Sequence, residues 1–439
     1  MSSSNLQNKI QNAGVVGAGG AGFPTHVKLT SKFEYLIANG AECEPLICKD
    51  KELMKAFAPD IVEGLMLTRE LIESQKTIIG IKSKNIAEIN SLKNNIDGRV
   101  KFCLINDVYP AGDEYVLVYE ATGRLVPQGG IPLEIGCVVA NVETLYNIKL
   151  ASRDIPVIEK FVTVAGTVKK PSTFKVPIGT SIADCIKLAG GATVAEYAVL
   201  SGGAMMGDLV TDMSLPVTKT TSGFIVLPKE HQLIVRRSLP RKAVKRVGAS
   251  ACDQCYRCTE LCPRWLLGYD IEPHEVMRSL SFAGEKWDSY SRRSLNCIEC
   301  NICSLYACPE DLDPKNVCTW AKRELIAKGQ RSDKSRKLRI HPARSGRQVP
   351  TKLLTRKLGL SQYDVVAPYL EIDFVPEFVR MPLKQHIGVA AISIVSIGDR
   401  VRKGDLIADL PSDKLGAKIH ASIDGIIKSI DDNIIIAKA

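Results

Sequence analysis

The chain has 439 residues, 45% of them hydrophobic and 24% charged, with a formal net charge of +10. This length allows about three domains of roughly 100 to 200 residues each. The N-terminus has no apolar signal-peptide core and no run of about 18 apolar residues occurs, so we expect a cytoplasmic protein without a membrane span. The 14 cysteines do not indicate a secreted disulfide scaffold, because eight of them gather in two short runs.

The first part of the chain alternates short apolar runs with helix-compatible stretches. Tyr35 to Ala38, Thr77 to Ile81 and Lys101 to Ile105 are typical of buried strands, whereas Lys55 to Glu73 is typical of a helix. This alternation predicts an α/β domain over residues 1–155.

A glycine-rich loop, Gly17 to Gly22, fits the dinucleotide-binding fingerprint. A Rossmann unit, however, needs a strand before this loop and a full helix after it, and here only Val15 and Val16 precede it while Pro24 follows closely. Closely spaced glycines still let backbone N–H groups approach a phosphate or a flat ring. Two interpretations therefore stay open: a ligand-binding loop or a plain tight turn.

The composition changes from Phe161 to about Leu227. Valine- and threonine-rich runs alternate there with glycine and proline turns, with one helix expected near Ser181 to Ala189. We predict a small β-rich module over residues 156–230.

Two four-cysteine runs, each followed by a proline, dominate residues 231–330. Three thiolates spaced three residues apart can hold three corners of an Fe4S4 cube, while the cysteine before the proline reaches a second cube. This spacing predicts two [4Fe-4S] clusters, one bound by Cys252, Cys255, Cys258 and Cys308 and the other by Cys297, Cys300, Cys303 and Cys262. The second run has one extra residue before its last cysteine, and Cys318 is a nearby spare. Structural zinc is the alternative, but it would leave the Cys-Pro cysteines idle.

Positive charge gathers beside the cysteine runs. The basic residues before the first run are Arg236, Arg237, Arg241, Lys242, Lys245 and Arg246. A second basic stretch runs from Arg331 to Arg347, within a segment, residues 331–380, that we predict to be a linker. Because neither stretch carries interleaved aromatic residues or a nucleic-acid motif, we expect no nucleic-acid binding. Cations here would instead stabilise negatively charged clusters.

Residues 381–439 alternate strand-like runs with Gly-Asp and Asp-Gly turns, which predicts a compact all-β sandwich. Lys414, after Asp413, lies at the spacing of the modified lysine in lipoyl domains. The residues before this pair, Pro411 and Ser412, differ from the usual lipoyl pattern, and a shared fold does not import a function. We therefore favour an unmodified, structural role.

Four segments in order resemble the flavin-bearing, NADH-oxidising subunit of respiratory complex I. The loop GAGGAGFPTHVK, residues 17–28, resembles that family's GRGGAGFPTGLK-type loop. Residues 39–45, 109–114 and 140–145 resemble its Asn-x-Asp-Glu-x-Glu-Pro, Tyr-x-x-Gly-Glu-Glu and Asn-Asn-Val-Glu-Thr-Leu segments.

This resemblance implies that FMN is held by Gly17, Gly19, Gly20, Lys28, Asn39, Glu42, Asn141 and Thr144. It further implies that NADH contacts Phe23, Glu44 and Glu114, the two glutamates being the candidate catalytic residues. Ala18, Ala41 and Ala140 depart from the pattern, and each lacks the polar group that the family has there.

The whole chain resembles the Rnf-complex C subunits and the cobalamin reductases of propanediol-utilisation microcompartments, and its domain order is that of the reductases. The resemblance implies a multidomain α/β and α+β protein: a Rossmann-like FMN- and NADH-binding domain (1–155), an SLBB-type β-grasp module (156–230), a two-cluster ferredoxin-like helical region (231–330) and a barrel-sandwich domain (381–439).

The function implied is hydride transfer from NADH to FMN, followed by one-electron transfer through the clusters to cobalamin. Implied partners are a corrinoid, a corrinoid adenosyltransferase and a microcompartment shell protein, with the chain inside the microcompartment. Two alternatives stay open. One is an Rnf-like protein that delivers electrons to a ferredoxin, a membrane complex or another microcompartment enzyme. The other is a metal-stabilised docking or nucleic-acid adaptor without turnover.

Overall fold

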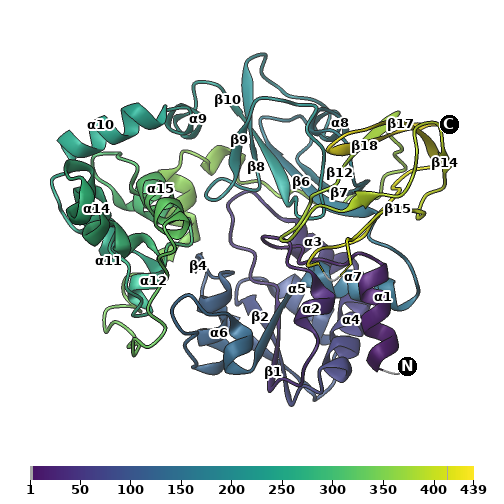
Figure 1. Ribbon diagram of the computed structural model, residues 1–439, viewed down its shortest axis with the longest axis horizontal. Helices are drawn as coiled ribbons and strands as arrows, with labels where there is room; N and C mark the ends of the chain where they lie inside the picture. The colour runs from purple at the N-terminus through teal and green to yellow at the C-terminus, as the bar shows by residue number, and fades with distance from the viewer. Residues whose placement is uncertain (1–2, 413) are drawn as a thin grey trace.

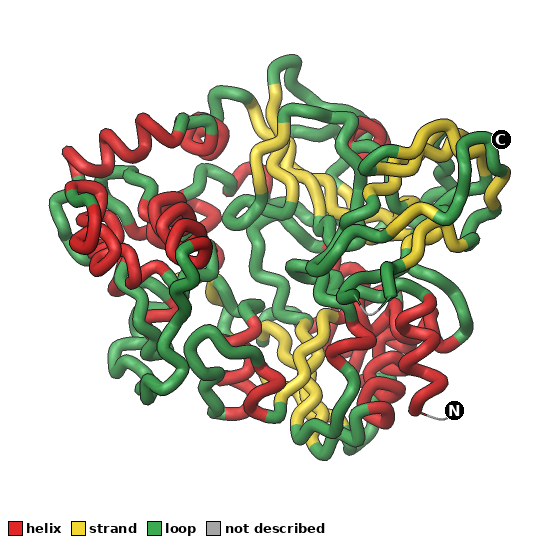
Figure 2. Tube along the Cα trace, in the orientation of Figure 1, coloured by secondary structure: helices red, strands yellow, loops and turns green. Residues whose placement is uncertain are grey.

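The computed structural model describes residues 3–412 and 414–439, so Asp413 of the lipoyl-like pattern lies outside the described residues. Four regions follow one another along the chain (Figure 1). The N-terminal region lies at the bottom of that view, the second region above it, the helical third region at the left and the C-terminal strands at the upper right. Figure 2 shows the helices gathered in the first and third regions and most of the strands in the other two.

A four-stranded parallel sheet in the order β3-β2-β1-β5 forms the centre of the first region. Its strands are β1 (Tyr35–Asn39), β2 (Lys76–Lys82), β3 (Val100–Ile105) and β5 (Cys137–Asn141). The register places Asn39 beside Asn141 at the carboxyl ends of two neighbouring strands. In open parallel sheets, ligands bind outside this edge.

Helices cover both faces of this sheet. They are α1 (Ser3–Asn12), α2 (Thr25–Lys28), α3 (Lys49–Ala56), α4 (Ala58–Leu71), α5 (Ile86–Lys93), α6 (Glu114–Thr122), the 3₁₀ turn η1 (Pro132–Ile135) and α7 (Val142–Ser152). Leu117 of α6 packs with Ile37 on one face, and Leu145 of α7 packs with Leu36 on the other, as the two-residue period of a strand requires. Gly64 allows α4 to approach α7, because a Cβ there would collide with the Leu145 carbonyl.

The second region is a five-stranded sheet in the order β7-β6-β10-β8-β9, covered by one helix. Its elements are β6 (Glu159–Gly166), β7 (Ser172–Pro177), α8 (Ile182–Leu188), β8 (Tyr197–Ser201), β9 (Asp208–Val210) and β10 (Gly223–Pro228). The first and last strands, β6 and β10, are parallel neighbours, while the other pairs are antiparallel. Cys185 and Ile186 of α8 pack with Phe224 in a buried core of their own.

The third region is made of short helices around the cysteine runs. They are α9 (Gln232–Arg237), α10 (Arg241–Ala251), α11 (Arg257–Glu260), α12 (Pro263–Leu266), α13 (Pro273–Arg278), η2 (Ser279–Ser281), α14 (Gly284–Ser291), η3 (Arg292–Ser294), the π turn η4 (Cys303–Ala307) and α15 (Pro314–Ala327). Cys262 and Cys297 belong to one buried cluster of side chains, whereas Cys258, Cys300 and Cys303 belong to another.

The segment predicted as a basic linker is partly folded. It contains β11 (Val349–Pro350), which pairs with β4 (Val108–Tyr109), then α16 (Thr351–Lys357) and η5 (Ser361–Tyr363). Leu354, Leu358 and Leu360 are buried with Leu233 and Cys300, so apolar spacing within the basic segment decides the packing. The segment thereby ties the first region to the cysteine region.

The C-terminal strands form two small sheets, β12-β18-β17-β14 and β13-β15-β16. Their bounds are β12 (Phe378–Pro382), β13 (Ile392–Ser393), β14 (Arg400–Val401), β15 (Leu406–Asp409), β16 (Ile419–His420), β17 (Gly425–Ile430) and β18 (Asn433–Lys438). Lys414 is exposed in the connection between β15 and β16.

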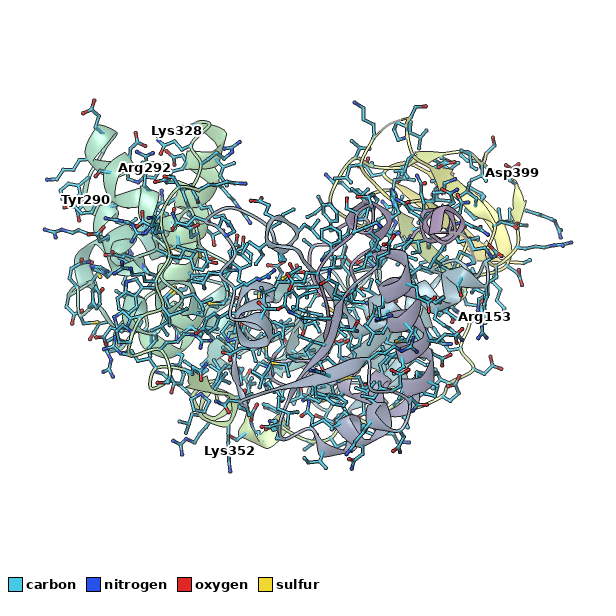
Figure 3. The ribbon with its side chains drawn as sticks, turned by 90° about the horizontal axis from the view of Figure 1, so that it is seen from below. Arg153, Tyr290, Arg292, Lys328, Lys352 and Asp399 are labelled. Atoms are coloured by element: carbon cyan, nitrogen blue, oxygen red, sulfur yellow. The ribbon has the colours of Figure 1, made fainter. Side chains whose placement is uncertain are left out.

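The cysteine region and the C-terminal sandwich lie at opposite ends of the molecule. Figure 3 shows Tyr290, Arg292 and Lys328 on the first of these ends and Asp399 on the other, with the N-terminal region between them. Across the residues described, none of the helices combines the length and apolar character needed to cross a membrane.

Candidate flavin cavity and cysteine quartets

A cavity of about 620 Å³ opens at the carboxyl ends of β1 and β5. Its walls come from the glycine loop, the segment after β1, the segment from Tyr109 to Glu114 and the start of α7. All eleven side chains or glycines expected to contact FMN or NADH line it: Gly17, Gly19, Gly20, Phe23, Lys28, Asn39, Glu42, Glu44, Glu114, Asn141 and Thr144. The fold therefore brings together residues from five separate segments.

The glycine loop is a closed turn whose backbone faces this cavity. Gly17 N donates to Phe23 O at 3.0 Å, and only the four-residue α2 follows, so no Rossmann crossover helix is present here. Ala18 N donates to the Thr144 hydroxyl at 2.9 Å, which fastens the loop to α7. A Cβ on Gly20 would meet no protein atom within 4 Å, so open space lies against the loop at this position.

Lys28 brings a positive charge to the opposite side of the loop. Its Nζ donates to Val139 O at 2.5 Å and lies 3.4 Å from Glu114 Oε1. Lys28 is largely buried, whereas Glu114 is half exposed. A phosphate or another anion in the cavity would therefore compete with Glu114 for this cation.

Two buried glutamates face the cavity in different environments. Glu44 accepts hydrogen bonds from Met205 N at 2.8 Å and Met206 N at 2.9 Å, yet burial raises its pKa to about 7. Burial and the nearby Asp50 carboxylate raise the pKa of Glu42 to about 7 as well. Glu42 Oε2 is buried without a hydrogen-bond partner, which indicates room for a polar ligand group at this point.

A buried network of charged groups supports the cavity, and the sequence did not predict it. Asn141 Nδ2 donates to Asp50 at 2.7 Å, and Lys49 lies 2.5 Å from Asp50 and 2.8 Å from Glu143. Lys160 pairs with Glu143 at 2.5 Å and donates to the Ala18 carbonyl at 3.3 Å. Its pKa falls to about 8 because of burial. The only local signal was Glu143, which lies between the two predicted ligands of the Asn-Val-Glu-Thr segment.

The eight clustered cysteines surround two small cavities, four to each. One is lined by Cys252, Cys255, Cys258 and Cys308, here the distal quartet. The other is lined by Cys297, Cys300, Cys303 and Cys262, here the proximal quartet. Each run thus contributes its last cysteine to the opposite quartet, as in two-cluster ferredoxins. The buried Cys318 thiol instead hydrogen-bonds to Cys297.

The two cysteine loops share an unusual backbone conformation. Gln254 and Tyr256 in the first loop have φ of 59° and 71°, and Glu299 and Asn301 at the matching places in the second have 60° and 67°. Each such residue costs of order 1 kcal/mol or more, so two loops strained in the same way indicate that both wrap the same kind of group. Burial raises the pKa of Cys258 and Cys262 to about 12, so positively charged iron would be needed to keep these thiolates charged.

The proximal quartet adjoins the flavin cavity. Ile298, between Cys297 and Cys300, lines the cavity wall. Tyr109 donates its hydroxyl to the Cys300 carbonyl at 2.9 Å and lies 3.4 Å from Glu44 Oε1. The distal quartet reaches the surface, because Cys255 is exposed.

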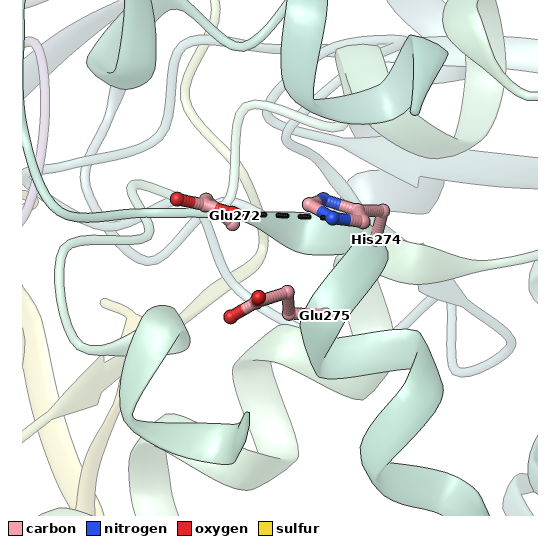
Figure 4. Close-up of side chains that lie close together, drawn as sticks. All are labelled: Glu272, His274 and Glu275. Atoms are coloured by element: carbon pink, nitrogen blue, oxygen red, sulfur yellow. Dashed lines mark ion pairs between the residues drawn. The ribbon is translucent and has the colours of Figure 1, made fainter. Parts of the chain in front are cut away.

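A third group of metal-type side chains, Glu272, His274 and Glu275, lies beside the distal quartet on and before α13 (Figure 4). Glu272 Oε2 and His274 Nε2 are 3.9 Å apart. Arg293 Nε, however, donates to Glu275 at 3.1 Å, and Thr259 hydrogen-bonds to His274 Nδ1 at 2.9 Å. These partners already balance the charge of the group, so we interpret it as an ion-pair cluster that fastens α13.

Four known domain families match the chain in order. They are the Nuo51 FMN-binding domain (residues 10–150), the SLBB domain (161–209), the 4Fe-4S dicluster domain (251–313) and the RnfC barrel sandwich hybrid domain (369–439). The predicted fold class and the predicted cofactor types, FMN and two [4Fe-4S] clusters, are thereby confirmed. The roles of the individual residues stay predictions.

Characterised relatives cover nearly the whole chain. The cobalamin reductase PduS of Salmonella typhimurium is 41% identical over 439 residues, covering 99% of this chain and 96% of that protein. PduS of Citrobacter freundii is 40% identical, covering 98% and 95%. The RnfC-type member of the proton-translocating ferredoxin:NAD(+) oxidoreductase complex of Clostridium ljungdahlii is 35% identical, covering 58% and 55%.

Among solved structures, an NAD+-reducing [NiFe]-hydrogenase in the H2-reduced state is similar with a TM-score of 0.51. The identity is 20%, and the match covers 74% of this chain and 61% of that one. At this identity the similarity concerns the fold alone.

Proposed function

We propose, on the premise that this chain belongs to the family of the cobalamin reductase PduS, that it is an oxidoreductase that passes electrons from NADH to a cobalamin. The observation that carries the proposal is the contact between the flavin cavity and the proximal quartet through Ile298 and Tyr109. An electron route from a nicotinamide site to one-electron centres requires this adjacency.

The residues fit the cofactors that the domain families bind. Gly17, Gly19 and Gly20 would present backbone to FMN, Lys28 would offset its phosphate charge, and Glu42 has a free carboxylate oxygen for a polar group. When bound, FMN supplies acceptance of a hydride from nicotinamide and release of single electrons, and the clusters supply one-electron transfer.

Glu44 and Glu114 would orient NADH from two sides of the cavity. Glu44 is rigid, because two backbone N–H groups hold its carboxylate. Glu114 is half exposed and is paired with Lys28 only at 3.4 Å, so it is free to turn towards an incoming ribose or carboxamide. Phe23, in the same wall, would pack against a flat ring.

The geometry orders the two quartets. Tyr109 and Ile298 place the proximal quartet against the flavin cavity, and the exposed Cys255 brings the distal quartet to the surface. Electrons would leave the protein from the distal quartet, beside the exposed basic helix α10.

The test uses protein reconstituted without oxygen with FMN, iron and sulfide. Addition of NADH should produce cob(II)alamin from cob(III)alamin, and Cys300→Ala should lose most of this activity while retaining NADH-dependent reduction of a two-electron dye. Cys185→Ala, a buried cysteine in the second region, is the matched control and should retain both. Dye reduction by the wild type with no reduction of any corrinoid would refute the acceptor.

A second candidate acceptor comes from the partial matches to RnfC-type members of ion-translocating complexes. On that view the chain would deliver electrons to a ferredoxin or to a membrane complex. The four domain families occur here on one chain that aligns with PduS almost end to end, which favours the corrinoid. We further propose a corrinoid adenosyltransferase and a microcompartment shell protein as partners, with the chain inside the microcompartment. Co-purification with each tests these partners.

A further inference from the structure

A second cavity of about 360 Å³ lies between the first region and the cysteine region. Cys297 of the proximal quartet and Ile298 line it, together with four cationic side chains: Arg264, Lys322, Arg331 and Lys334. No aspartate or glutamate is among the described residues that line it. A cavity with this charge is built for an anion.

The cations are only partly neutralised from outside the cavity. Lys334 pairs with Glu134 at 2.9 Å, and Arg264 pairs with Asp113 at 2.9 Å. Lys322 donates to the Cys297 carbonyl at 2.6 Å, and Arg331 donates to the carbonyls of Ile326 and Gln330. In the described part of the chain neither Lys322 nor Arg331 has a carboxylate partner, so two positive charges stay uncompensated here.

Arg264 is the most rigid of the four. Its residue exposure is 4%, and its guanidinium lies 3.4 Å from the centre of the Tyr115 ring. Its Nε is buried without a hydrogen-bond partner. A guanidinium held in place with a free donor is the arrangement that recognises phosphate oxygens.

The second cavity adjoins the flavin cavity. Ile298 lines both, and neighbouring residues of the same segments line one or the other: Glu114 and Ile131 the flavin cavity, Tyr115 and Gly130 the second. An elongated ligand that enters one cavity can therefore place its far end in the other.

We propose that this second cavity binds a phosphate ester carried by one of the redox substrates. Its volume suits a phosphate with a sugar and excludes a corrin ring. Two substrates of the proposed function, on which the choice of source rests, carry such a group: the dinucleotide has a diphosphate, and a cobalamin has a phosphodiester in its nucleotide loop. Either source would hold its substrate beside Cys297.

The cations have a simpler alternative role, which is to stabilise the negative charge of a cluster in the proximal quartet. Lys322 is the nearest candidate for it, because it bonds to the Cys297 backbone. Arg331 is the better probe of ligand binding, since it is exposed and bonds only to carbonyls of its own segment.

The experiment compares reconstituted wild type, Arg331→Glu and Lys337→Glu by titration calorimetry, after flavin and iron contents are shown to be equal. Lys337 is an exposed cation six residues further along that does not line the cavity. The probes are ADP-ribose, cyanocobalamin and dicyanocobinamide, the last of which lacks the nucleotide-loop phosphate.

We expect Arg331→Glu to weaken one phosphate-bearing probe at least tenfold and Lys337→Glu to leave it within twofold. Loss for ADP-ribose alone assigns the dinucleotide, whereas loss for cyanocobalamin but not for dicyanocobinamide assigns the corrinoid. Unchanged binding of every probe by Arg331→Glu, or a wild type that binds neither ADP-ribose nor cyanocobalamin, overturns the proposal. Since calorimetry needs no turnover, these results are distinct from a failure of cobalamin reduction.

Discussion

Replacing Gly20 by alanine separates flavin binding from folding. The added Cβ would meet no protein atom within 4 Å, so the fold accommodates it, yet it would stand where FMN approaches the loop. The replacement of Gly19 is the matched contrast. There a Cβ would lie 2.7 Å from Asn141 Nδ2, in a place that the protein itself fills.

The two substitutions should differ in the free energy of unfolding of the flavin-free protein. Gly20→Ala should leave it unchanged or raise it by up to about 1 kcal/mol, since alanine restricts the unfolded chain. Gly19→Ala should lower it by about 1 to 3 kcal/mol, because it displaces Asn141, which caps α7 through Glu143 N at 2.9 Å and bonds to Asp50. For FMN, the Gly20 change should cost at least about 1.4 kcal/mol, a tenfold rise in Kd.

Urea unfolding of the flavin-free proteins gives the stabilities, and quenching of flavin fluorescence gives Kd. The iron content of both variants should equal that of the wild type, because the quartets lie in another region. A Gly20→Ala protein that binds FMN as tightly as the wild type would refute the position of the flavin over this loop. Destabilisation of the flavin-free Gly20→Ala protein would instead refute the open space beside it.

Three further changes test other parts of the site. Cys255→Ala should lower iron from about eight to about four per chain, because the proximal quartet is untouched; complete loss of iron would contradict two separate quartets. Burial raises the pKa of Glu42 and Glu44 from 4.5 to about 7, so their contribution to the free energy of unfolding is fully present below pH 4.5 and is lost as the pH rises through 7. Glu42→Gln should therefore flatten this decline in urea unfolding of the flavin-free protein between pH 5 and pH 8, and an unchanged slope would contradict the buried charge. Tyr109→Phe should cost about 1 kcal/mol of stability and slow cluster reduction by NADH more than dye reduction, both followed by stopped flow; equal slowing would argue against the bridge to the proximal quartet.

Local spacing carried much of the site. The cysteine spacing predicted two quartets with exchanged last ligands, and the structure groups the eight cysteines in that way. The glycine loop alone left two interpretations open, and only its resemblance together with three other segments indicated FMN. Those signals were readable because thiolate spacing and backbone access to a ligand are set within a few residues.

Other features depend on residues that are distant in sequence. Lys160 meets Glu143 and the glycine loop only after the second region packs on the first, and Tyr109 reaches Cys300 across 191 positions. Isolated lysines and tyrosines carry no spacing signal, and most such residues lie on the surface. No local pattern therefore predicted their burial.

The sequence by itself determined the domain types, the cofactor types and the cysteines that form each quartet, because these depend on short-range patterns of residues. Only the tertiary structure decided which quartet adjoins the flavin cavity, how Glu42 and Glu44 acquire a raised pKa, and that Arg264 and Arg331 line one cavity beside Cys297. The physical reason is that burial, charge balance and adjacency arise when separate regions pack together, and none of them is a property of a single segment.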